Sequence, residues 1–266
     1  MRRFAPLLCL LLFACGPDDA TATSQGEANE AVTQTEKPKN TQAQSLFPNG
    51  NFSKGNLNWF TYQYKNRGGF RVVRDGPGDG TYPSGPAGRL TLEPGPAKPG
   101  FRVATMEIED KQLLELPKRL RGRYFVETWE PGIAMPWIEV GVVAFGPDTR
   151  PMTPPAYAKY VTLVLAGRDQ EKIQTRTYFD LGNEVKIIPK DAEGKPTVKL
   201  GTDVETGRWI EFEFDVEDAF REHWGVMSNS CNGVRVFGKI VVGDYIPEEK
   251  GEFKAVVYFD DIYAGD

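Results

Sequence analysis

The sequence predicts an all-β fold, a β-sandwich or jelly roll, for the folded part of the chain. Three features support this prediction. Apolar and polar residues alternate in many short segments, these segments are rich in β-branched and aromatic residues, and Gly, Pro or Asp separates them. About nine short strands divided by such turn signals are typical of sandwiches and jelly rolls. A folded part of about 220 residues fits one such domain.

The expected elements follow one another from residue 68 to the C-terminus. We expect strands over residues 68–75, 89–93, 121–129, 136–146, 160–167, 172–182, 208–216, 233–243 and 253–265, with no internal repeat. Two segments favour short helices, residues 110–116 and residues 216–225, and the second has an aspartate N-cap candidate at Asp215 or Asp218. Because residues 76–100 are crowded with Gly and Pro, we expect long loops there around one short strand.

The N-terminal segment, MRRFAPLLCLLLFACG, has the organisation of an export signal. Two arginines precede an apolar stretch that is too short to cross a bilayer core of about 30 Å. The run LFAC, which ends at Cys15, resembles the lipobox of bacterial lipoproteins, although Phe13 is bulkier than that family usually has. The resemblance implies a signal peptide over residues 1–14, lipidation of Cys15 and a cell-envelope location. Gly16 favours the outer membrane, if the organism has one.

Residues 15–45 are expected to form a flexible tether between this lipid and the folded domain, which we place at residues 46–266. The tether segment after Cys15 is rich in Ala, Thr, Gln, Glu, Asn, Pro and Lys and has no aromatic residue before residue 46. Such a composition buries too little apolar surface to offset the entropy of ordering. Its root-mean-square reach is about 30 Å, so the membrane is expected as a partner only through the anchor.

Composition excludes several classes of function. The chain has a formal net charge of −5 and no basic tract, which argues against a nucleic-acid partner. Cys231 is the single cysteine of the expected folded domain, so no intramolecular disulfide is available there. His223 is the single histidine of the chain, which leaves no His-rich metal site and no His-based triad.

Both ends of the expected domain resemble carbohydrate-binding modules with a galactose-binding-like jelly-roll fold. The opening LFPNGNFSKGNLNWF matches the family pattern at Asn49, Gly50, Phe52, Gly55 and Trp59, and the closing strand matches it at Tyr258, Asp260 and Asp261. The resemblance implies a jelly roll, a glycan partner, and packing roles for Trp59 and Trp209. It also implies a structural calcium ion with Asp260 as a ligand, but Ser53 stands where the family usually has a glutamate ligand. The alternative for Asp260 is a turn cap or an ion pair with a nearby arginine.

Two strands carry the candidate ligand residues. Alternation along residues 123–129 places Glu127 and Trp129 on one face, and alternation along residues 137–145 places Trp137 and Glu139 on one face. If the two strands pair as a hairpin through EPGIAMP, these four residues line one surface. Arg176 and Tyr178 from a later strand are expected to join them. The alternative is that the surface packs beneath the loop at 76–100 and forms no groove.

These features favour a membrane-anchored, non-catalytic glycan-binding lipoprotein that holds polysaccharide at the cell surface or in the periplasm. Aromatic faces stack on sugars while a few polar groups fix their orientation, which is why Trp next to Glu points to this chemistry. One alternative is an envelope adhesion or interaction protein that uses the jelly roll as a scaffold. The other is a glycan hydrolase or lyase, because Glu127 and Glu139 could flank a glycosidic bond across a hairpin.

Overall fold

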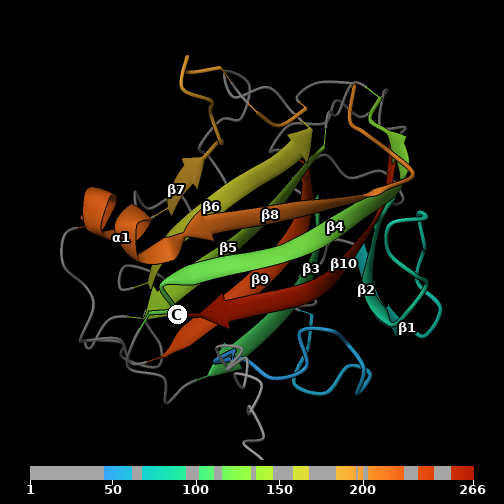
Figure 1. The fold of residues 1–266 in the computed structure, drawn as a ribbon, viewed down its shortest axis with the longest axis horizontal. Helices are drawn as coiled ribbons and strands as arrows, with labels where there is room; N and C mark the ends of the chain where they lie inside the picture. Colours follow the sequence, from blue (N-terminus) through green and yellow to red (C-terminus); the bar gives the residue numbers. More distant parts are fainter. Residues whose placement is uncertain are drawn as a thin grey trace, which may run out of the picture. The chain divides into compact units, whose positions relative to one another are not determined.

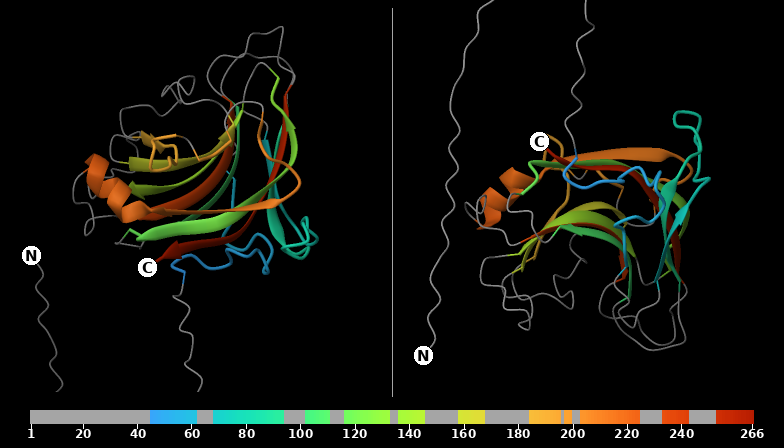
Figure 2. Two further views of the ribbon diagram at one scale, coloured as in Figure 1. Left: turned by 45° about the horizontal axis from the view of Figure 1, so that its top comes forward. Right: turned by 90° about the horizontal axis from the view of Figure 1, so that it is seen from below.

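The jelly-roll prediction is confirmed by the computed structural model (Figure 1). It describes residues 45–61, 68–93, 102–110, 116–132, 136–145, 158–167, 184–195, 197–199, 203–224, 233–242 and 253–266. The described strands form two five-stranded sheets. Figure 2 shows these sheets as curved layers packed face to face.

The first sheet, called here the β4 sheet, has the strand order β1-β2-β10-β4-β8. Its strands are β1 (Gly68–Val73), β2 (Ala87–Leu92), β10 (Lys254–Gly265), β4 (Arg119–Glu130) and β8 (Trp209–Asp215). The second, the β5 sheet, has the order β3-β9-β5-β6-β7. Its strands are β3 (Arg102–Asp110), β9 (Val234–Val242), β5 (Trp137–Phe145), β6 (Ala158–Gly167) and β7 (Glu184–Ile187). Neighbouring strands are antiparallel except β6 and β7, which are parallel.

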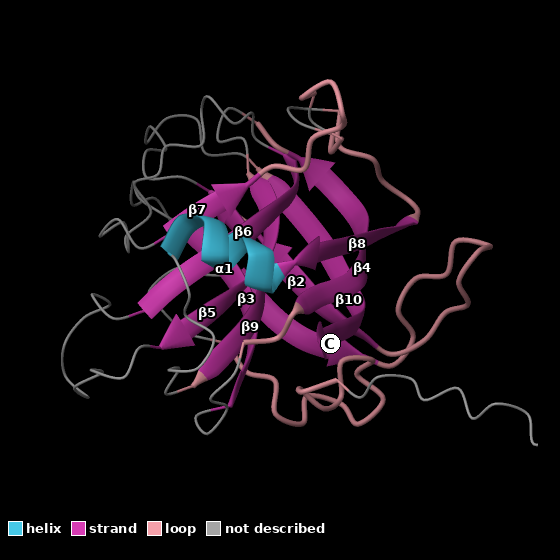
Figure 3. Ribbon diagram, turned by 60° about the vertical axis from the view of Figure 1, so that its left-hand side comes forward, coloured by secondary structure: helices cyan, strands magenta, loops and turns pink. Residues whose placement is uncertain are grey.

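Helix α1 (Val216–Trp224) follows β8 directly and confirms the second expected helix. Asp218 N donates to Asp215 Oδ1 at 2.8 Å, so Asp215 is the N-cap. The helix contacts β4 and β6, one strand from each sheet, and Figure 3 shows it in cyan against the strands. In the part of the chain that the structure describes, no helix has the length and apolar character needed to cross a membrane.

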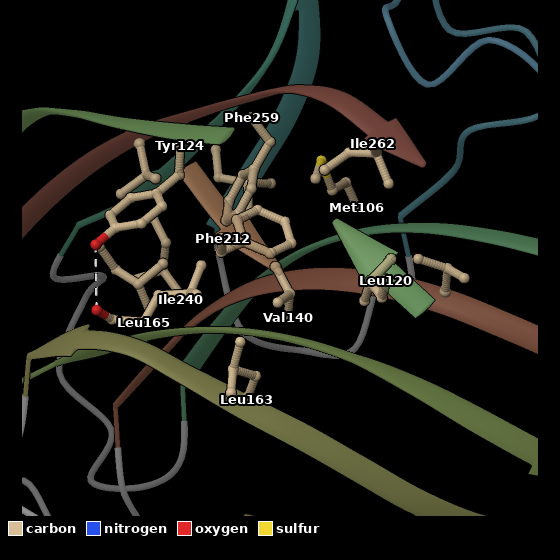
Figure 4. Close-up of a cluster of buried hydrophobic side chains, with 14 of the residues drawn as sticks. Met106, Leu120, Tyr124, Val140, Leu163, Leu165, Phe212, Ile240, Phe259 and Ile262 are labelled. Carbon is tan, nitrogen blue, oxygen red and sulfur yellow. Dashed lines mark hydrogen bonds between the residues drawn. The ribbon is translucent and has the colours of Figure 1, made fainter. Parts of the chain in front are cut away.

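The core lies between the sheets, where alternate side chains of the strands are buried, and those of the edge strands β1 and β7 are partly buried. Figure 4 shows part of it, with side chains from both sheets in contact: Met106, Leu120, Tyr124, Val140, Leu163, Leu165, Phe212, Ile240, Phe259 and Ile262. Tyr124, the polar member of this set, donates its hydroxyl to Leu165 O at 3.1 Å. A buried hydroxyl needs such a partner, so this bond makes the tyrosine compatible with the core.

The segment that opens the domain is fastened to β10, the last strand. Ile262 N donates to Gly50 O at 3.0 Å, and a Cβ at Gly50 would lie 1.8 Å from Ile262 O, so only glycine fits there. Trp59 is 4% exposed, its Nε1 donates to Asn49 O at 2.9 Å, and its ring lies 5.0 Å from that of Phe52. The predicted packing role of Trp59 is therefore confirmed, and the opening motif serves the fold.

Some predicted elements differ from the structure. β3 and β7 were not predicted. The helix predicted at 110–116 is not supported at either end, because Asp110 closes β3 and Leu116 is not helical, while 111–115 lie outside the described residues. The strand predicted at 172–182 also lies outside them.

Candidate functional site

The outer face of the β5 sheet, which points away from the β4 sheet, combines aromatic and charged side chains. Alternate residues of the same strands, such as Met106, Val140 and Ile240, belong to the inter-sheet core. We call this side of the sheet the β5 outer face, and most of its side chains are buried. Its members are Val103, Thr105, Glu107, Arg235, Phe237, Lys239, Val241, Trp137, Glu139, Gly141, Val143, Phe145, Tyr160, Thr162, Val164, Glu184 and Lys186.

Glu139 anchors the centre of this face and is 1% exposed. Its Oε2 accepts hydrogen bonds from Trp137 Nε1 at 2.7 Å and from Lys186 Nζ at 2.8 Å, and Lys239 Nζ lies 3.9 Å from its Oε1. Lys186 also donates to Glu184 at 2.9 Å. Burial alone would lower the pKa of Lys186, but the two glutamates outweigh burial and raise it, so Lys186 stays protonated.

A second ion pair joins β3 to β9. Arg235 Nη1 donates to Glu107 Oε2 at 2.9 Å. The Arg235 guanidinium carbon lies 5.2 Å from the ring centroid of Phe145 and 6.0 Å from that of Phe60, whose backbone bridges to Glu107. Burial raises the pKa of Glu107, although Lys239 and Arg235 oppose this effect. The arginine is thus held by a carboxylate and by two rings.

Aromatic residues of this region differ in exposure. Trp137 and Phe237 are buried, and Lys239 Nζ lies 3.7 Å from the ring centroid of Phe237. Phe60, Phe145 and Tyr160 are partly exposed. These three, which we call the aromatic edge, offer ring surface beside charged donors, an arrangement suited to a polar ligand that also has C–H faces.

The structure separates the four residues that sequence analysis placed on one surface. β4 and β5 belong to different sheets, so the predicted hairpin is wrong. Trp137 and Glu139 lie on the β5 outer face, as alternation along β5 predicted. Glu127 lies on the outer face of the β4 sheet, where it accepts a hydrogen bond from Tyr258 at 3.1 Å. Glu127 and Glu139 therefore point to opposite sides of the sandwich and cannot flank one glycosidic bond.

A β-bulge turns Trp129 to the inner face. The pairing with β10 passes from Val126↔Val257 to Thr128↔Val256 and skips Glu127, which reverses the alternation beyond it. Trp129 then lies opposite Ala255, packs against the inter-sheet core, and its buried Nε1 has no hydrogen-bond partner. The prediction that Trp129 shares a face with Glu127 is wrong. The other two predicted ligand residues, Arg176 and Tyr178, lie outside the described residues.

The loop of residues 74–86, between β1 and β2, covers part of the outer face of the β4 sheet. Trp209 N donates to Asp79 Oδ2 at 2.7 Å, and Trp209 Nε1 donates to Pro77 O at 2.8 Å. From the same loop, Tyr82 donates its hydroxyl to Glu211. Trp209 is buried against Phe125, so its predicted packing role is confirmed. The loop thus covers Trp209 and Glu211 of β8, whereas the Glu127 side chain, which sequence analysis offered as part of a covered surface, is 46% exposed.

Asp260 lies beside Arg123 on β4. Arg123 Nη2 donates to Asp260 Oδ2 at 2.6 Å and lies 3.0 Å from Asp261 Oδ2. Burial raises the pKa of Asp260 to about 6, although Arg123 opposes this effect. A guanidinium at this distance repels a metal cation, and the described residues include no cluster of three or more His, Cys, Asp or Glu. The surroundings of Asp260 fit the ion pair that the sequence offered as the alternative to calcium.

Sequence reasoning missed five charged members of the β5 outer face. Arg235 and Lys239 alternate with Phe237 in a strand that was predicted, so alternation could have identified them. Glu107, Glu184 and Lys186 lie on the two strands that were not predicted. These three residues join the β5 outer face because of the strand order of the sheet, and the local sequence does not reveal that order.

Comparisons with known proteins find similarity only at the level of solved structures. No protein-family model matches the chain, and no curated protein matches it. The chain is similar to a family 61 carbohydrate-binding module in complex with β-1,4-galactotriose (TM-score 0.40, 9% identity, 84% of this chain and 98% of that chain). It is also similar to a non-crystalline-cellulose-specific carbohydrate-binding module of family 28 (TM-score 0.38, 10% identity, 80% of this chain and 91% of that chain). A third similar structure is a mutant of the ENZbleach xylanase (TM-score 0.39, 8% identity, 77% of this chain and 78% of that chain). Similarities this distant transfer neither ligand nor activity.

Proposed function

We propose that this protein is a lipid-anchored, non-catalytic glycan-binding protein that holds polysaccharide at the cell surface or in the periplasm. The observation that carries the proposal is the aromatic edge beside Arg235, at the border of the β5 outer face. Partly exposed rings stack on the C–H faces of sugars, and charged donors orient their hydroxyl groups.

The buried centre of the β5 outer face gives the aromatic edge a rigid support. Trp137, Glu139 and Lys186 are buried and joined by short hydrogen bonds, so they hold strands β5 to β7 in one arrangement. A surface that is already ordered loses little conformational entropy when a ligand binds.

A binding role also agrees with the ion pairing of the carboxylates on the β5 outer face. Glu107, Glu139 and Glu184 each form an ion pair with a cation of the same face. Carboxylates held in this way serve as anchors for donors, whereas a hydrolase needs two of them directed at one bond.

The anchor is the second part of the proposal. Lipidation of Cys15 would fix the chain to a bilayer, and the diacyl or triacyl modification of the lipoprotein family supplies the two or more chains that stable anchoring needs. With a tether of about 30 Å root-mean-square reach, the domain binds glycan close to the membrane that carries it.

Affinity for immobilised glycans tests the proposal. The full chain in mild detergent is applied to a glycan array beside Phe145→Ala and Tyr160→Ala. We expect binding to at least one glycan and about a fivefold loss in each variant, since a stacked ring contributes about 1 kcal/mol. Tyr263→Ala is the matched control, because Tyr263 is a partly exposed tyrosine of the β4 sheet. Absence of any bound glycan, or binding unaffected by both variants, would sink the proposal.

A further inference from the structure

We propose that the outer face of the β1–β2 strand pair binds the carboxylate or sulfate of an acidic polysaccharide through Arg71, Arg89 and Thr91. We call these three residues the β1–β2 site. It lies on the β4 sheet, away from the aromatic edge, so it goes beyond the proposed function and does not depend on it. Arg71 and Arg89 are direct partners in the antiparallel pairing of β1 with β2. Because Phe70 and Val72 pack against the inter-sheet core, the alternating Arg71 lies on the outer face.

Arg89 is fixed by three neighbouring side chains. Its Nε donates to the Tyr258 hydroxyl at 3.1 Å, and its Nη1 donates to Thr91 Oγ1 at 2.8 Å. Its Nη2 donates to Glu127 Oε2 at 3.5 Å, and the Arg89 side chain is 20% exposed. A guanidinium has five N–H groups, so two of them remain for a ligand. Since the guanidinium is already oriented, little conformational entropy is lost when an anion binds it.

The groups on the β1 side of Arg89 are hydrogen-bond donors. The Arg71 side chain is exposed and forms no ion pair with any residue that the structure describes. The Thr91 hydroxyl accepts from Arg89 and keeps its own O–H to donate. Glu127 belongs to β4, which is three strand spacings, about 14 Å, from β1. Like charges directly opposite each other in a sheet repel, so an anion bound beside both arginines is stabilised.

Gly69 leaves open space beside these donors. It is the register partner of Thr91, and it precedes Arg71 by two residues, so it lies on the same face of β1. A Cβ at Gly69 would have no heavy atom within 4 Å other than those of its chain neighbours. A glycine inside a strand permits a close approach to the backbone. A planar carboxylate or a sulfate therefore has room between Arg71 and Thr91.

An acidic polysaccharide is the source of this anion that the surface favours. Arg71 lies on β1, the edge strand, so a long polymer can cross the site and continue past the sheet. Among the residues that the structure describes, the exposed large hydrophobic side chains are Leu46 and Leu57, both in the opening segment. The β1–β2 site thus lacks the apolar anchor with which proteins bind a membrane surface. The chain has a net charge of −5, so attraction of a polyanion has to be local.

Affinity electrophoresis of the full chain in mild detergent, at about 50 mM salt, tests this inference. Separate gels contain polygalacturonate, whose acidic groups are carboxylates, dextran sulfate, whose acidic groups are sulfates, and neutral mixed-linkage β-glucan. We expect retardation by at least one acidic polymer and its loss at about 500 mM salt, because exposed charges are screened. Retardation by one acidic polymer and not the other identifies the oxyanion that the site takes.

Two variants test the position of the anion. Arg71→Gln removes a charged donor and should weaken retardation by the acidic polymer about fivefold, the equivalent of about 1 kcal/mol. Gly69→Val fills the open space without changing the charge, and it should weaken retardation by a similar factor. Valine suits a strand, and urea unfolding checks that both variants stay folded. Arg121→Gln is the matched control, because it removes an exposed arginine from the same outer face, above Tyr263.

Three results would overturn the inference. The first is the absence of retardation by either acidic polymer. The second is equal weakening in Arg71→Gln and Arg121→Gln, because this result indicates a general attraction of charge. The third is full retardation of Gly69→Val, which places the anion elsewhere. The neutral gel reports on glycan binding without charge, so the proposed function and this inference can fail independently.

Discussion

Lys186 Nζ lies 2.8 Å from Glu139 Oε2, although β7 and β5 are separated by β6. The lysine side chain therefore extends over Thr162, its partner residue on β6, to reach a glutamate on the second strand away. Burying a charge without a partner is costly, so each group depends on the other. The contact fastens the short parallel edge strand β7 to the centre of the β5 sheet.

Lys186→Met should lower the free energy of unfolding by about 3–5 kcal/mol, because the buried Glu139 loses the cation at 2.8 Å and keeps Lys239 at 3.9 Å and the Trp137 N–H donor. Urea unfolding measures the loss. The double variant Lys186→Met/Glu139→Gln should recover much of it, since the unpaired charge is gone. Lys195→Met, which removes an exposed pair with Glu193, should change stability by less than about 1 kcal/mol. A single variant as stable as the wild type would contradict this account.

Trp137 and Trp129 should respond differently to the same substitution. Trp137→Phe removes the hydrogen bond to a buried, charged Glu139 and should cost about 1–3 kcal/mol. Trp129→Phe removes an N–H that is buried without a partner, so it should cost less. Denaturant unfolding of both variants gives the comparison. Equal losses would argue against the inward orientation of Trp129.

This pair of tryptophans shows what the sequence could and could not predict. Strict alternation placed Trp137 and Glu139 on one face correctly, because β5 pairs regularly with β9 from Trp137 onward. It failed for Trp129 because a bulge inserts one residue at Glu127, and one residue reverses every side chain beyond it. Nothing local to residues 121–129 signals that insertion.

Connectivity explains the remaining errors. The segment EPGIAMP has the length of a hairpin loop, yet β4 and β5 lie in different sheets, and loop length does not distinguish a hairpin from a crossing between sheets. β3 is built partly from Ala, Met and Glu, which are not strong strand formers, and β7 has four residues. Both strands depend on tertiary pairing with β9 and β6, and the charged half of the β5 outer face depends on them.

Asp260 should make stability depend on pH in an unusual direction. Its folded pKa of about 6 lies above the ordinary value of 3.8, so the folded state takes up a proton between about pH 4 and 6. The resulting stabilisation of the folded state is fully present at a pH below the ordinary pKa of 3.8 and is lost as the pH rises through 6. Relative to Asp260→Asn, the wild type should gain up to about 3 kcal/mol as the pH falls from about 7 to 4. Parallel stability curves for the two proteins, from denaturant unfolding at each pH, would contradict the raised pKa.

Calcium provides a separate test at the same residue. Because Arg123 holds Asp260 Oδ2 at 2.6 Å, we expect the unfolding temperature to be the same in calcium and in chelator. The structural calcium that the family resemblance implies predicts a rise of several degrees instead, since an ion that binds only the folded state stabilises it. A rise seen in the wild type and absent from Asp260→Asn would establish Asp260 as a ligand after all.

Cys15 should decide where the protein resides. Diacyl or triacyl modification makes the chain amphiphilic, because each buried methylene contributes about 0.8 kcal/mol to membrane binding. In the native host, we expect the full chain to enter the detergent-rich phase of a Triton X-114 extraction and to incorporate labelled palmitate. Cys15→Ser should lose the label and move to the aqueous phase. Cys9→Ser and Cys231→Ser are the matched controls, because they remove the other two cysteines and leave the proposed lipidation site intact. If Cys15→Ser stays in the detergent phase, another segment holds the protein at the membrane and the tether model fails, whereas the glycan-binding proposal for the β5 outer face is unaffected.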